Sequence, residues 1–596
     1  MENRRNIGID ALKGLAIIAI VIYHFGGGFL PYGYLGVEVF LVISGYLLMK
    51  SLIRAFADNS FSYWRFITDK VVRLWPMVLI FAGISLLTGY FVMLPDDYEN
   101  LSQSVIAANV FMNNVLACIT TKNYWDVVNA FKPLMHTWYL GVLMQAYVVL
   151  PLILMASYRI SGKHKAALPV ATFMVTMLSL GMYLFPGISA AQKFYFVHTR
   201  LFEMTAGAMV AFVPKRQMET QKQRGIVLGS CVALALLCAA ICIQQALIPD
   251  WTRLLLTVAA TVMLVTGCQM VEYHGSKLLQ LLAIPGRASM SVYICHQVLV
   301  AFMFYSITDK KSIWILMAFL LVTGIVSTAT YFLLEKPING WAKARKWLVF
   351  ALCGVLCVAL TGAAGLVYLR AGVVRDIPEL GIEKDHVHRG MHAEYCDIPY
   401  QWNRDFTQTD KVRVAVIGNS FGRDWANILN ESGIAGDIEI SYIYPHSMEY
   451  VRGLRERLDD ADFVFCTLWL SDEEVDEQLI EMIPEDKLYV VGYKSFGSSN
   501  GIVYARRGLP GYLSQSVRLT ESVFEHNEML QEKYGEHFID MLSPVRLEDG
   551  SIRVFSDDGR FLSQDCRHLT KAGAEYYANR LDLEWILTTP TDSAEE

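Results

Sequence analysis

The C-terminal part of the chain carries a serine in a setting that suits nucleophilic catalysis. Ser420 follows the apolar run 412–417 and a Gly-Asn turn, and residues 422–429 are predicted to form a helix. A nucleophile at a strand-to-helix turn is exposed, and the N–H groups at the helix N-terminus can stabilise an oxyanion. The alternative interpretation is that Asn419 or Ser420 only caps the helix.

An aspartate and a histidine near the chain end supply the partners that such a serine needs. Asp565 and His568 lie three residues apart ahead of a predicted helix, so one rigid loop can deliver both side chains. His568 would accept the proton of Ser420, and Asp565 would orient the imidazole. Strand and helix signals alternate between the two sites, with strands expected over 463–468 and 488–492, which favours a parallel sheet.

The first apolar segment holds two ionisable residues of its own, Lys13 and His24. A spacing of eleven residues returns to the same helix face within about 20° and separates the two side chains by about 16 Å along the axis. Ionisable groups inside a bilayer are costly and are functional candidates, so we expect both to face one interior cavity. The alternative for Lys13 is that it extends to the inner membrane surface, with His24 marking the outer one.

These candidate residues belong to two parts of very different composition. The chain has 596 residues, of which 54% are hydrophobic and 18% charged, too apolar for an ordinary globular protein. Apolar blocks of about 18–22 residues, long enough to cross about 30 Å of hydrocarbon, recur up to about residue 369. A net charge of −6 argues against nucleic-acid binding. No cleavage site follows the first block, so we expect it to be retained as a span.

Eleven membrane spans are predicted, and lysine and arginine concentrate in alternate loops. The positive-inside rule then places the N-terminus in the cytoplasm, and an odd number of spans places the C-terminal domain on the opposite side. The predicted spans are 10–29, 35–52, 74–93, 134–156, 167–185, 196–213, 225–246, 252–271, 288–307, 313–334 and 347–369.

Further polar residues recur in the spans. Arg200 and Glu203 are one turn apart, which suits either a functional role or an internal ion pair that holds the helices together. Glu335 is expected to be structural, at a helix end stopped by Pro337. The others are Glu38, His136, Gln145 and His296. Cysteine and histidine spacings indicate no metal site, and a disulfide between Cys396 and Cys566 stays open.

Taken together, the membrane part resembles the membrane acyltransferase family 3, whose members O-acetylate polysaccharides. The matching segments, in the family's order, are 9–16 with His24, 33–47, Lys70 and Arg73 ahead of Pro76, 133–140, Thr199 to Gly207, Tyr293 to His296, and Tyr331 to Pro337. Lys13 and Lys70 stand where the family carries arginines, which keeps the charge but loses bidentate recognition. Leu143, Met144 and Gln145 stand where many relatives have two glutamates.

The resemblance implies acyl transfer from a cytoplasmic acyl-CoA, usually acetyl-CoA, with no metal. Lys70 and Arg73 would bind the CoA phosphates at the inner face. His24 would act as the base for thioester acyl transfer, with Lys13 in the same site. The glycines at 26–28 would permit close approach or a broken helix, although a flexible turn is an equal alternative.

The C-terminal part resembles the SGNH hydrolase family. Gly418-Asn419-Ser420 stands for its Gly-Asp-Ser block, with Asn419 in place of the aspartate, and Asp565 with His568 stands for its last block. The oxyanion glycine and asparagine of the central blocks are not evident, and Gly492 and Asn500 are the candidates.

The predicted fold is thus a polytopic α-helical membrane bundle followed by an α/β SGNH domain with a parallel sheet. The predicted organisation is an acyltransferase membrane domain (1–346), a further transmembrane helix (347–369), a linker (370–410) and an extracytoplasmic domain (411–596). The expected function is transfer of acetyl to an exported polysaccharide such as O-antigen or capsule, in a bacterial inner membrane. The expected partners are acyl-CoA, a cell-surface glycan and the lipid bilayer, without nucleic acid. Alternatives are a peptidoglycan O-acetyltransferase, an extracellular carbohydrate esterase and a transporter.

Overall fold

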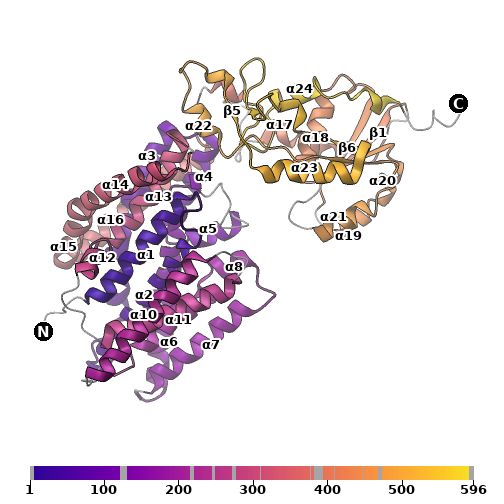
Figure 1. Cartoon of the computed structure of the whole chain (residues 1–596). Coiled ribbons are helices and arrows are strands. Elements are labelled where there is room, and N and C mark those ends of the chain that lie inside the picture. Colours follow the sequence, from indigo (N-terminus) through magenta and orange to yellow (C-terminus); the bar gives the residue numbers. More distant parts are fainter. Residues whose placement is uncertain are drawn as a thin grey trace. The chain divides into compact units, whose positions relative to one another are not determined.

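The computed structural model of the chain divides into two compact units (Figure 1). The helical membrane unit comprises Met1–Phe91 and Asn100–Leu366, and the α/β unit comprises Val92–Glu99 and Val367–Glu596. The described residues are 6–120, 130–164, 166–214, 220–243, 248–270, 277–308, 310–375, 377–381, 393–407, 410–445, 448–467 and 473–588.

Ten segments of the described residues form helices that are long and apolar enough to cross a membrane. They coincide with ten of the eleven predicted spans. The segments contain α1 (Ile7–Phe25), α2 (Gly36–Ala57), α3 (Tyr63–Val92), α6 (Trp138–Ile160), α7 (Ala167–Leu184), α10 (Thr220–Cys242), α11 (Asp250–Met270), α13 (Ser289–Ser306), α14 (Ile313–Thr330) with α15 (Lys336–Ala344), and α16 (Lys346–Leu369).

The remaining predicted span, 196–213, is shorter than expected. It forms α9 (Val197–Val210), whose 14 residues extend about 21 Å and fall short of a 30 Å hydrocarbon layer. The helix nevertheless reverses the chain direction, because it runs antiparallel to α7: Thr176 bonds Thr205 at 2.8 Å, and Ser179 bonds the carbonyl of His198 at 2.7 Å. Prediction failed here because hydropathy counted flanking apolar residues that lie outside the helix.

Glycines set the closest helix contacts in the membrane unit. A Cβ at Gly45 of α2 would lie 1.7 Å from the Met204 carbonyl oxygen of α9, and one at Gly207 of α9 would lie 1.9 Å from that of Val42. Small residues at such crossings let backbones approach closely, which is a principal source of packing energy between membrane helices. In the same way, Gly14 of α1, the helix that carries Lys13 and His24, packs closely on α12 (Lys277–Arg287): a Cβ at Gly14 would lie 1.8 Å from the carbonyl oxygen of Leu282.

The α14 helix does not stop before Pro337 as predicted. A π-helical turn over Tyr331–Glu335 continues directly into α15, and Pro337 occupies the first turn of α15. Proline is tolerated there because its missing N–H has no partner in a first turn. Glu335 is the last residue of this π turn.

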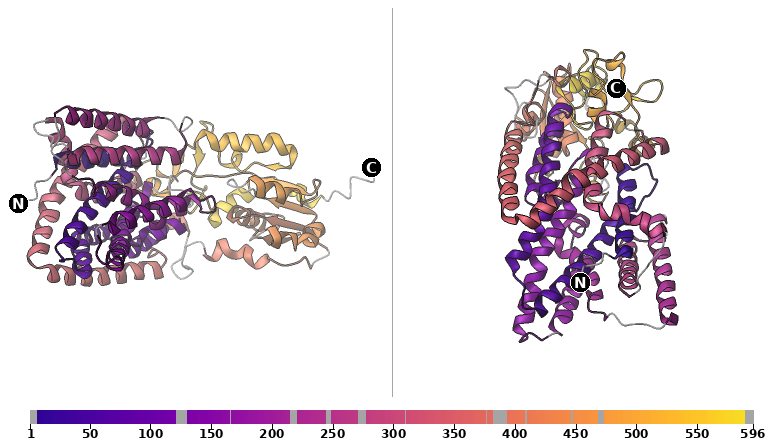
Figure 2. Two further views of the ribbon diagram at one scale, coloured as in Figure 1. Left: turned by 90° about the horizontal axis from the view of Figure 1, so that it is seen from below. Right: turned by 90° about the vertical axis from the view of Figure 1, so that its left-hand side faces the viewer.

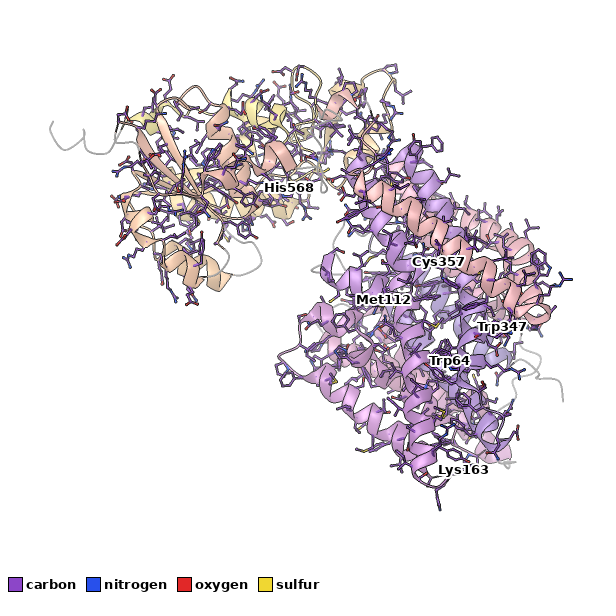
Figure 3. All side chains as sticks on the ribbon, turned by 180° about the vertical axis from the view of Figure 1, so that it is seen from behind. Trp64, Met112, Lys163, Trp347, Cys357 and His568 are labelled. Carbon is purple, nitrogen blue, oxygen red and sulfur yellow. The ribbon has the colours of Figure 1, made fainter. Side chains whose placement is uncertain are left out.

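Helices α3 and α16 run parallel, and each leads at its C-terminal end into the α/β unit. Asp69 pairs with Lys346 at their starts, and Leu360 packs on Gly83 further along. Trp64 and Trp347, both exposed, project from the first turns of these helices (Figure 3).

The two chain segments that follow α3 and α16 come together inside the α/β unit. Arg375 donates a hydrogen bond to the carbonyl of Met93, and Gly372, at φ +72°, lies so close to Pro95 that a Cβ would be 1.7 Å from its carbonyl oxygen. Leu94 and Ile377 are buried in one hydrophobic cluster with Ala371, Leu380, Val503, Tyr504, Val554, Phe555 and Phe561.

The α/β unit is built on a five-stranded parallel sheet in the order β2-β1-β3-β4-β6. Most of the unit is drawn in orange and yellow in Figure 2. The strands are β1 (Val412–Ile417), β2 (Ile438–Ile443), β3 (Phe463–Cys466), β4 (Leu488–Val491) and β6 (Phe538–Ile539). Alternate residues of β1 enter the two hydrophobic clusters of the unit: Val414 and Val416 one of them, Ala415 and Ile417 the other. Both faces are therefore covered, as in other parallel sheets, and the predicted parallel sheet is confirmed.

Candidate active site

Ser420, His568 and Asp565 form a connected set in the α/β unit. Ser420 is the first residue of α18 (Ser420–Glu431), and its Oγ lies 2.7 Å from Nε2 of His568, which Figure 3 labels. Nδ1 of His568 lies 2.7 Å from Oδ2 of Asp565. A carboxylate only accepts, so Nδ1 donates to Asp565, and Nε2 of the neutral ring is then the acceptor for the serine hydroxyl. The arrangement can deprotonate Ser420 during nucleophilic attack.

In the turn before Ser420, a different residue caps the helix, so the serine itself does not serve as the cap. Asn419 caps α18, its Oδ1 accepting from the N–H of Phe421 at 2.9 Å, so the hydroxyl of Ser420 is left to His568. The hydroxyl of Tyr442 donates to the carbonyl oxygens of both Gly418 and Asn419 at 3.0 Å. Asn419 is therefore the cap foreseen in the alternative interpretation.

The loop that carries Asp565 and His568 is stabilised by hydrogen bonds within the loop and by hydrogen bonds from Asn500. Oδ1 of Asp565 accepts from the backbone N–H groups of Arg567 and His568 at 3.0 and 2.8 Å. Asn500 donates both amide hydrogens to this loop, to the carbonyls of Ser563 at 2.7 Å and Gln564 at 3.1 Å. Asn500 therefore has no hydrogen left for an oxyanion, and its proposed place in the oxyanion hole is wrong.

Gly492, the other oxyanion candidate, follows β4 in a tightly packed position. A Cβ there would lie 2.7 Å from Oδ1 of Asn527, the atom that accepts the N–H of Tyr493 at 2.8 Å. Close packing explains the glycine without a role in catalysis.

A buried ion pair beside the triad was not foreseen from the sequence. Oδ2 of Asp424 accepts from Nζ of Lys494 at 2.7 Å and from the backbone N–H of Leu569, next to His568, at 3.0 Å. Both side chains are at most 2% exposed, and burial lowers the pKa of Lys494 although Asp424 opposes the shift. Asp424 lies one turn after Ser420, so the pair joins the nucleophile helix to the histidine loop. A charged residue on the inward face of an amphipathic helix was the available signal.

The cysteines near the triad are free thiols. Sγ of Cys396 lies 3.5 Å from the Leu569 carbonyl, and Sγ of Cys566 lies 3.3 Å from Oδ1 of Asn500. Burial raises the pKa of Cys396 to about 12, so this thiol stays protonated at neutral pH and is a poor nucleophile.

A cavity of about 150 Å³ in the membrane unit gathers the cations that the sequence singled out. Lys13 of α1 lines it together with Lys70 and Arg73 of α3, and Glu335 of the π turn faces them. Nζ of Lys70 lies 4.4 Å from the ring centre of Tyr147. The other lining residues are Phe40, Ser44, Leu47, Leu48, Leu74, Tyr139, Leu140, Leu143, Ser289, Met290 and Tyr293. The structure thus brings the three predicted cations together and adds Glu335, which was expected to be structural.

His24 is not among the residues that line this cavity in the described part of the chain, so the expectation that it shares one cavity with Lys13 is not confirmed. Its Nδ1 is 2.8 Å from Nε2 of His296, whose Nδ1 is 3.1 Å from the carbonyl of Val292. A carbonyl only accepts, so for neutral rings Nδ1 of His296 carries the proton and Nε2 is the acceptor. Nδ1 of His24 must then donate, which leaves the lone pair of His24 on Nε2.

Tyr293 connects the histidines to the cavity. Its ring lines the cavity and lies 5.9 Å from that of His296 and 4.8 Å from that of His136. His136 is 1% exposed, and neither of its ring nitrogens has a hydrogen-bond partner among the described residues. The sequence flagged His136 and His296 as polar residues in spans but not as neighbours of His24, because helix contacts across the bundle leave no local signal.

Arg200 and Glu203 form the internal ion pair of the alternative interpretation. Arg200 binds Glu38 at 2.9 Å and Glu203 at 3.1 Å, and all three side chains are at most 1% exposed. Gln145 bonds Asn114 at 2.9 Å. Among the residues with described positions, no group of His, Cys, Asp and Glu side chains is arranged to hold a metal ion.

Comparison with known proteins identifies the membrane unit. Residues 6–334, more than half of the chain, match the acyltransferase domain family. The O-acetyltransferase OatA of Staphylococcus aureus (strain NCTC 8325 / PS 47) is 24% identical over 353 residues, which cover 56% of this chain and 57% of that protein. A protein of Staphylococcus aureus (strain COL), provisionally named an O-acetyltransferase, is 29% identical over 213 residues, 35% of this chain and 34% of its own length.

The chain therefore spans about a third to somewhat more than half of the length of these curated relatives. No solved structure matches it. The parallel sheet of the α/β unit is consistent with the SGNH resemblance. The family match and the ten apolar helices of the described residues agree, and this chain belongs to the acyltransferase domain family as a multi-pass membrane protein.

Proposed function

We propose that this enzyme moves an acetyl group from cytoplasmic acetyl-CoA across the membrane to hydroxyls of an exported cell-surface polysaccharide such as O-antigen or capsule. The observation that carries the proposal is the Ser420–His568–Asp565 set, with both hydrogen bonds at 2.7 Å, in the same chain as an acyltransferase membrane unit. An acyl-serine next to the acceptor limits the loss of the group to water.

The cation-lined cavity is the proposed entry site for the donor. Lys13, Lys70 and Arg73 offer positive charge to the phosphates of CoA, and ammonium and guanidinium groups bind phosphate through charge-assisted hydrogen bonds. Glu335 is close enough to keep this cluster from being uniformly positive.

His24 is the proposed base at the membrane site. The hydrogen bond of its Nδ1 to His296 directs the basic lone pair to Nε2, which can take the proton of the acyl acceptor as the thioester bond breaks. The CoA thiolate leaves with the electron pair of that bond and is protonated on release.

The proposed orientation has the N-terminus in the cytoplasm and the α/β unit outside. It is supported by the basic inner loops and by α9, which is too short to count as a span but runs antiparallel to α7 and so reverses the chain direction, as an eleventh span would. A reporter fused after residue 400 should be active only in its extracytoplasmic form, and activity only in the cytoplasmic form would contradict the orientation.

At the outer site, Ser420 Oγ would attack the carbonyl of the acyl group delivered from the membrane site while its proton passes to Nε2 of His568. His568 then gives this proton to the atom of the delivering group that leaves as its bond to the acyl carbon breaks. The acyl-serine is then attacked by a glycan hydroxyl, whose proton His568 takes and returns to Ser420 as the ester bond to serine breaks. The serine and histidine are thereby regenerated, and the glycan carries the acetyl ester.

The test uses the full-length protein in proteoliposomes supplied with radiolabelled acetyl-CoA on the cytoplasmic side. Wild type should label alkali-treated cell-envelope glycan added outside, whereas Ser420→Ala and His24→Ala should each abolish labelling. Ser514→Ala is the matched control, because this exposed serine bonds only its own turn and should leave labelling unchanged. Full labelling by Ser420→Ala would reduce Ser420 to a structural residue.

A further inference from the structure

We propose that a binding subsite for one pyranose ring of the acceptor glycan lies beside Ser420, formed by the ring of Tyr400 and the carboxylate of Asp397. The inference rests on the proposed transfer from Ser420 to a glycan and specifies where the acceptor sits. Tyr400 belongs to the 3-10 helix η8 (Ile398–Trp402), which begins directly after Asp397. Tyr400 is 44% exposed, whereas most tyrosines of the α/β unit are covered.

One chain of contacts ties Tyr400 to the turn immediately before the nucleophile. The rings of Tyr400 and Tyr442 meet edge to face with centres 5.6 Å apart. The hydroxyl of Tyr442 donates to the carbonyls of Gly418 and Asn419 at 3.0 Å. Tyr400 is therefore one side chain removed from the backbone of the Ser420 turn.

A second and independent chain of contacts runs through the nucleophile helix. Arg423 lies three residues after Ser420 in α18, a spacing that places two side chains on neighbouring positions of one helix face. Arg423 donates to Oδ1 of Asp397 at 3.1 Å. Asp397 and Tyr400 are in turn three residues apart at a 3-10 helix, where such residues eclipse each other. Both routes place Tyr400 and Asp397 together on one flank of Ser420.

The chemistry of this flank suits a sugar. An aromatic ring covers the apolar C–H face of a pyranose, and a carboxylate accepts hydrogen bonds from its hydroxyls. Asp397 uses Oδ1 for Arg423, and its side chain is 49% exposed, so Oδ2 can accept from a hydroxyl. Tyr444, with its ring centre 6.3 Å from that of Tyr400, extends the aromatic surface along the end of β2.

The position also agrees with the sheet topology. Ser420 follows the carboxyl end of β1, and Tyr444 follows the carboxyl end of the neighbouring strand β2. Ligands of open parallel sheets bind outside the carboxyl ends of the strands, so the subsite lies at the edge of the sheet that ligands use, on the β2 side of β1 and not at the switch point between β1 and β3. Phe421 and Tyr493, whose rings are 5.2 Å apart, are each less exposed than Tyr400, so Tyr400 offers an acceptor more aromatic surface than either of them.

The test separates acylation of Ser420 from transfer to the acceptor in the full-length protein. Acylation is measured as the burst of p-nitrophenol from p-nitrophenyl acetate, and transfer as acetyl incorporated into alkali-treated cell-envelope glycan of the host bacterium. Tyr400→Ala should leave the burst within about twofold of wild type and raise the glycan concentration for half-maximal transfer about tenfold, the value of one aromatic contact. Tyr400→Phe keeps the ring and should remain within about threefold of wild type.

Two further variants make the outcome decisive. Met529→Ala removes a comparably exposed side chain, 54% accessible, from α23 (Glu521–Tyr534) and should change neither measurement. Asp397→Asn should raise the glycan concentration for half-maximal transfer without changing the burst of p-nitrophenol. Unchanged half-maximal glycan concentration in Tyr400→Ala would overturn the subsite. A wild type without a burst, or a Ser420→Ala variant with one, would instead contradict the proposed function itself.

Discussion

Nδ1 of His24 lies 2.8 Å from Nε2 of His296, and this contact decides which nitrogen of His24 is basic. The other ring nitrogen of His296 is fixed by the carbonyl of Val292, so the two rings form a directed hydrogen-bond chain. A backbone carbonyl thus determines, through two imidazoles, that the lone pair of His24 resides on Nε2.

Replacing His296 should therefore reduce the membrane step without removing the proposed base. His296→Leu is expected to lower acetyl transfer from acetyl-CoA about 10- to 100-fold, because His24 loses its preferred tautomer. His296→Gln, whose side-chain oxygen can accept from Nδ1 of His24, should recover part of the loss. Equal activity of the two variants would mean that the contact serves packing alone.

Asp565 should act on rate rather than on acceptor binding. Asp565→Asn is expected to lower the burst rate with p-nitrophenyl acetate by about 10³- to 10⁴-fold, because an amide can hold His568 in the wrong tautomer. Asp549→Asn serves as the control, since Asp549 is exposed and bonds only Ser551 of its own turn. A burst rate of Asp565→Asn within tenfold of the control would show that another group orients the imidazole.

The Asp424–Lys494 pair should be strongly coupled in stability. Each single variant, Asp424→Asn or Lys494→Met, leaves a buried partner uncompensated and should destabilise the α/β unit by about 3–5 kcal/mol. The double variant should recover most of that loss, because the amide that replaces the carboxylate carries no charge to balance and its oxygen can still accept the N–H of Leu569. Thermal unfolding of the four proteins measures the coupling, and additive single effects would show that the pair is not coupled.

The same lysine predicts a pH dependence of stability. Burial lowers the pKa of Lys494 in the folded protein, so between that lowered pKa and the ordinary value of 10.5 the unfolded chain binds more protons than the folded one. Stability contributed by Lys494 therefore rises with pH in this window. Lys494→Met should flatten the slope of unfolding free energy against pH, while Lys571→Met, which alters an exposed lysine, should not. An unchanged slope in Lys494→Met would show that Lys494 is not the source of this pH dependence of stability.

The cavity cations should determine donor affinity. Lys70→Ala and Arg73→Ala are each expected to raise the KM for acetyl-CoA about tenfold, the effect of one charge-assisted hydrogen bond, with a smaller change in kcat. Lys163→Ala is the control, because Lys163 lies in an exposed turn (Figure 3). If KM responds equally in the control, the phosphates bind elsewhere.

Local patterns in the sequence predicted the elements and the triad, and long-range contacts account for what they missed. The strand, turn and helix around Ser420 follow from alternation of apolar runs and a Gly-Asn turn, and Asp565 and His568 are close in the chain. Lys494 and Asp424 meet only through the tertiary fold, so no spacing reveals them. Glu335, expected to be structural, accepts a hydrogen bond from Ser291 of α13, and its additional place in the cavity lining depends on packing that no local pattern reveals.

The predictions that Asn500 is an oxyanion donor and that residues 196–213 form a membrane span failed for a related reason. An asparagine near a sheet edge looks available for an oxyanion until its two hydrogens are found on the Asp565 loop. Hydropathy measures the apolar content of a window, whereas the length of α9 is set by where the chain turns on either side of it.

The packing of Leu94 against Ile377 and Phe555 has a consequence for any fragment cut from this chain. The short segment that follows the membrane helix α3 completes the hydrophobic core of the α/β unit, so an α/β domain appended after α16 alone would lack it. A protease that released residues 370–596 would leave Leu94 behind, and the released fragment would have a gap in its core.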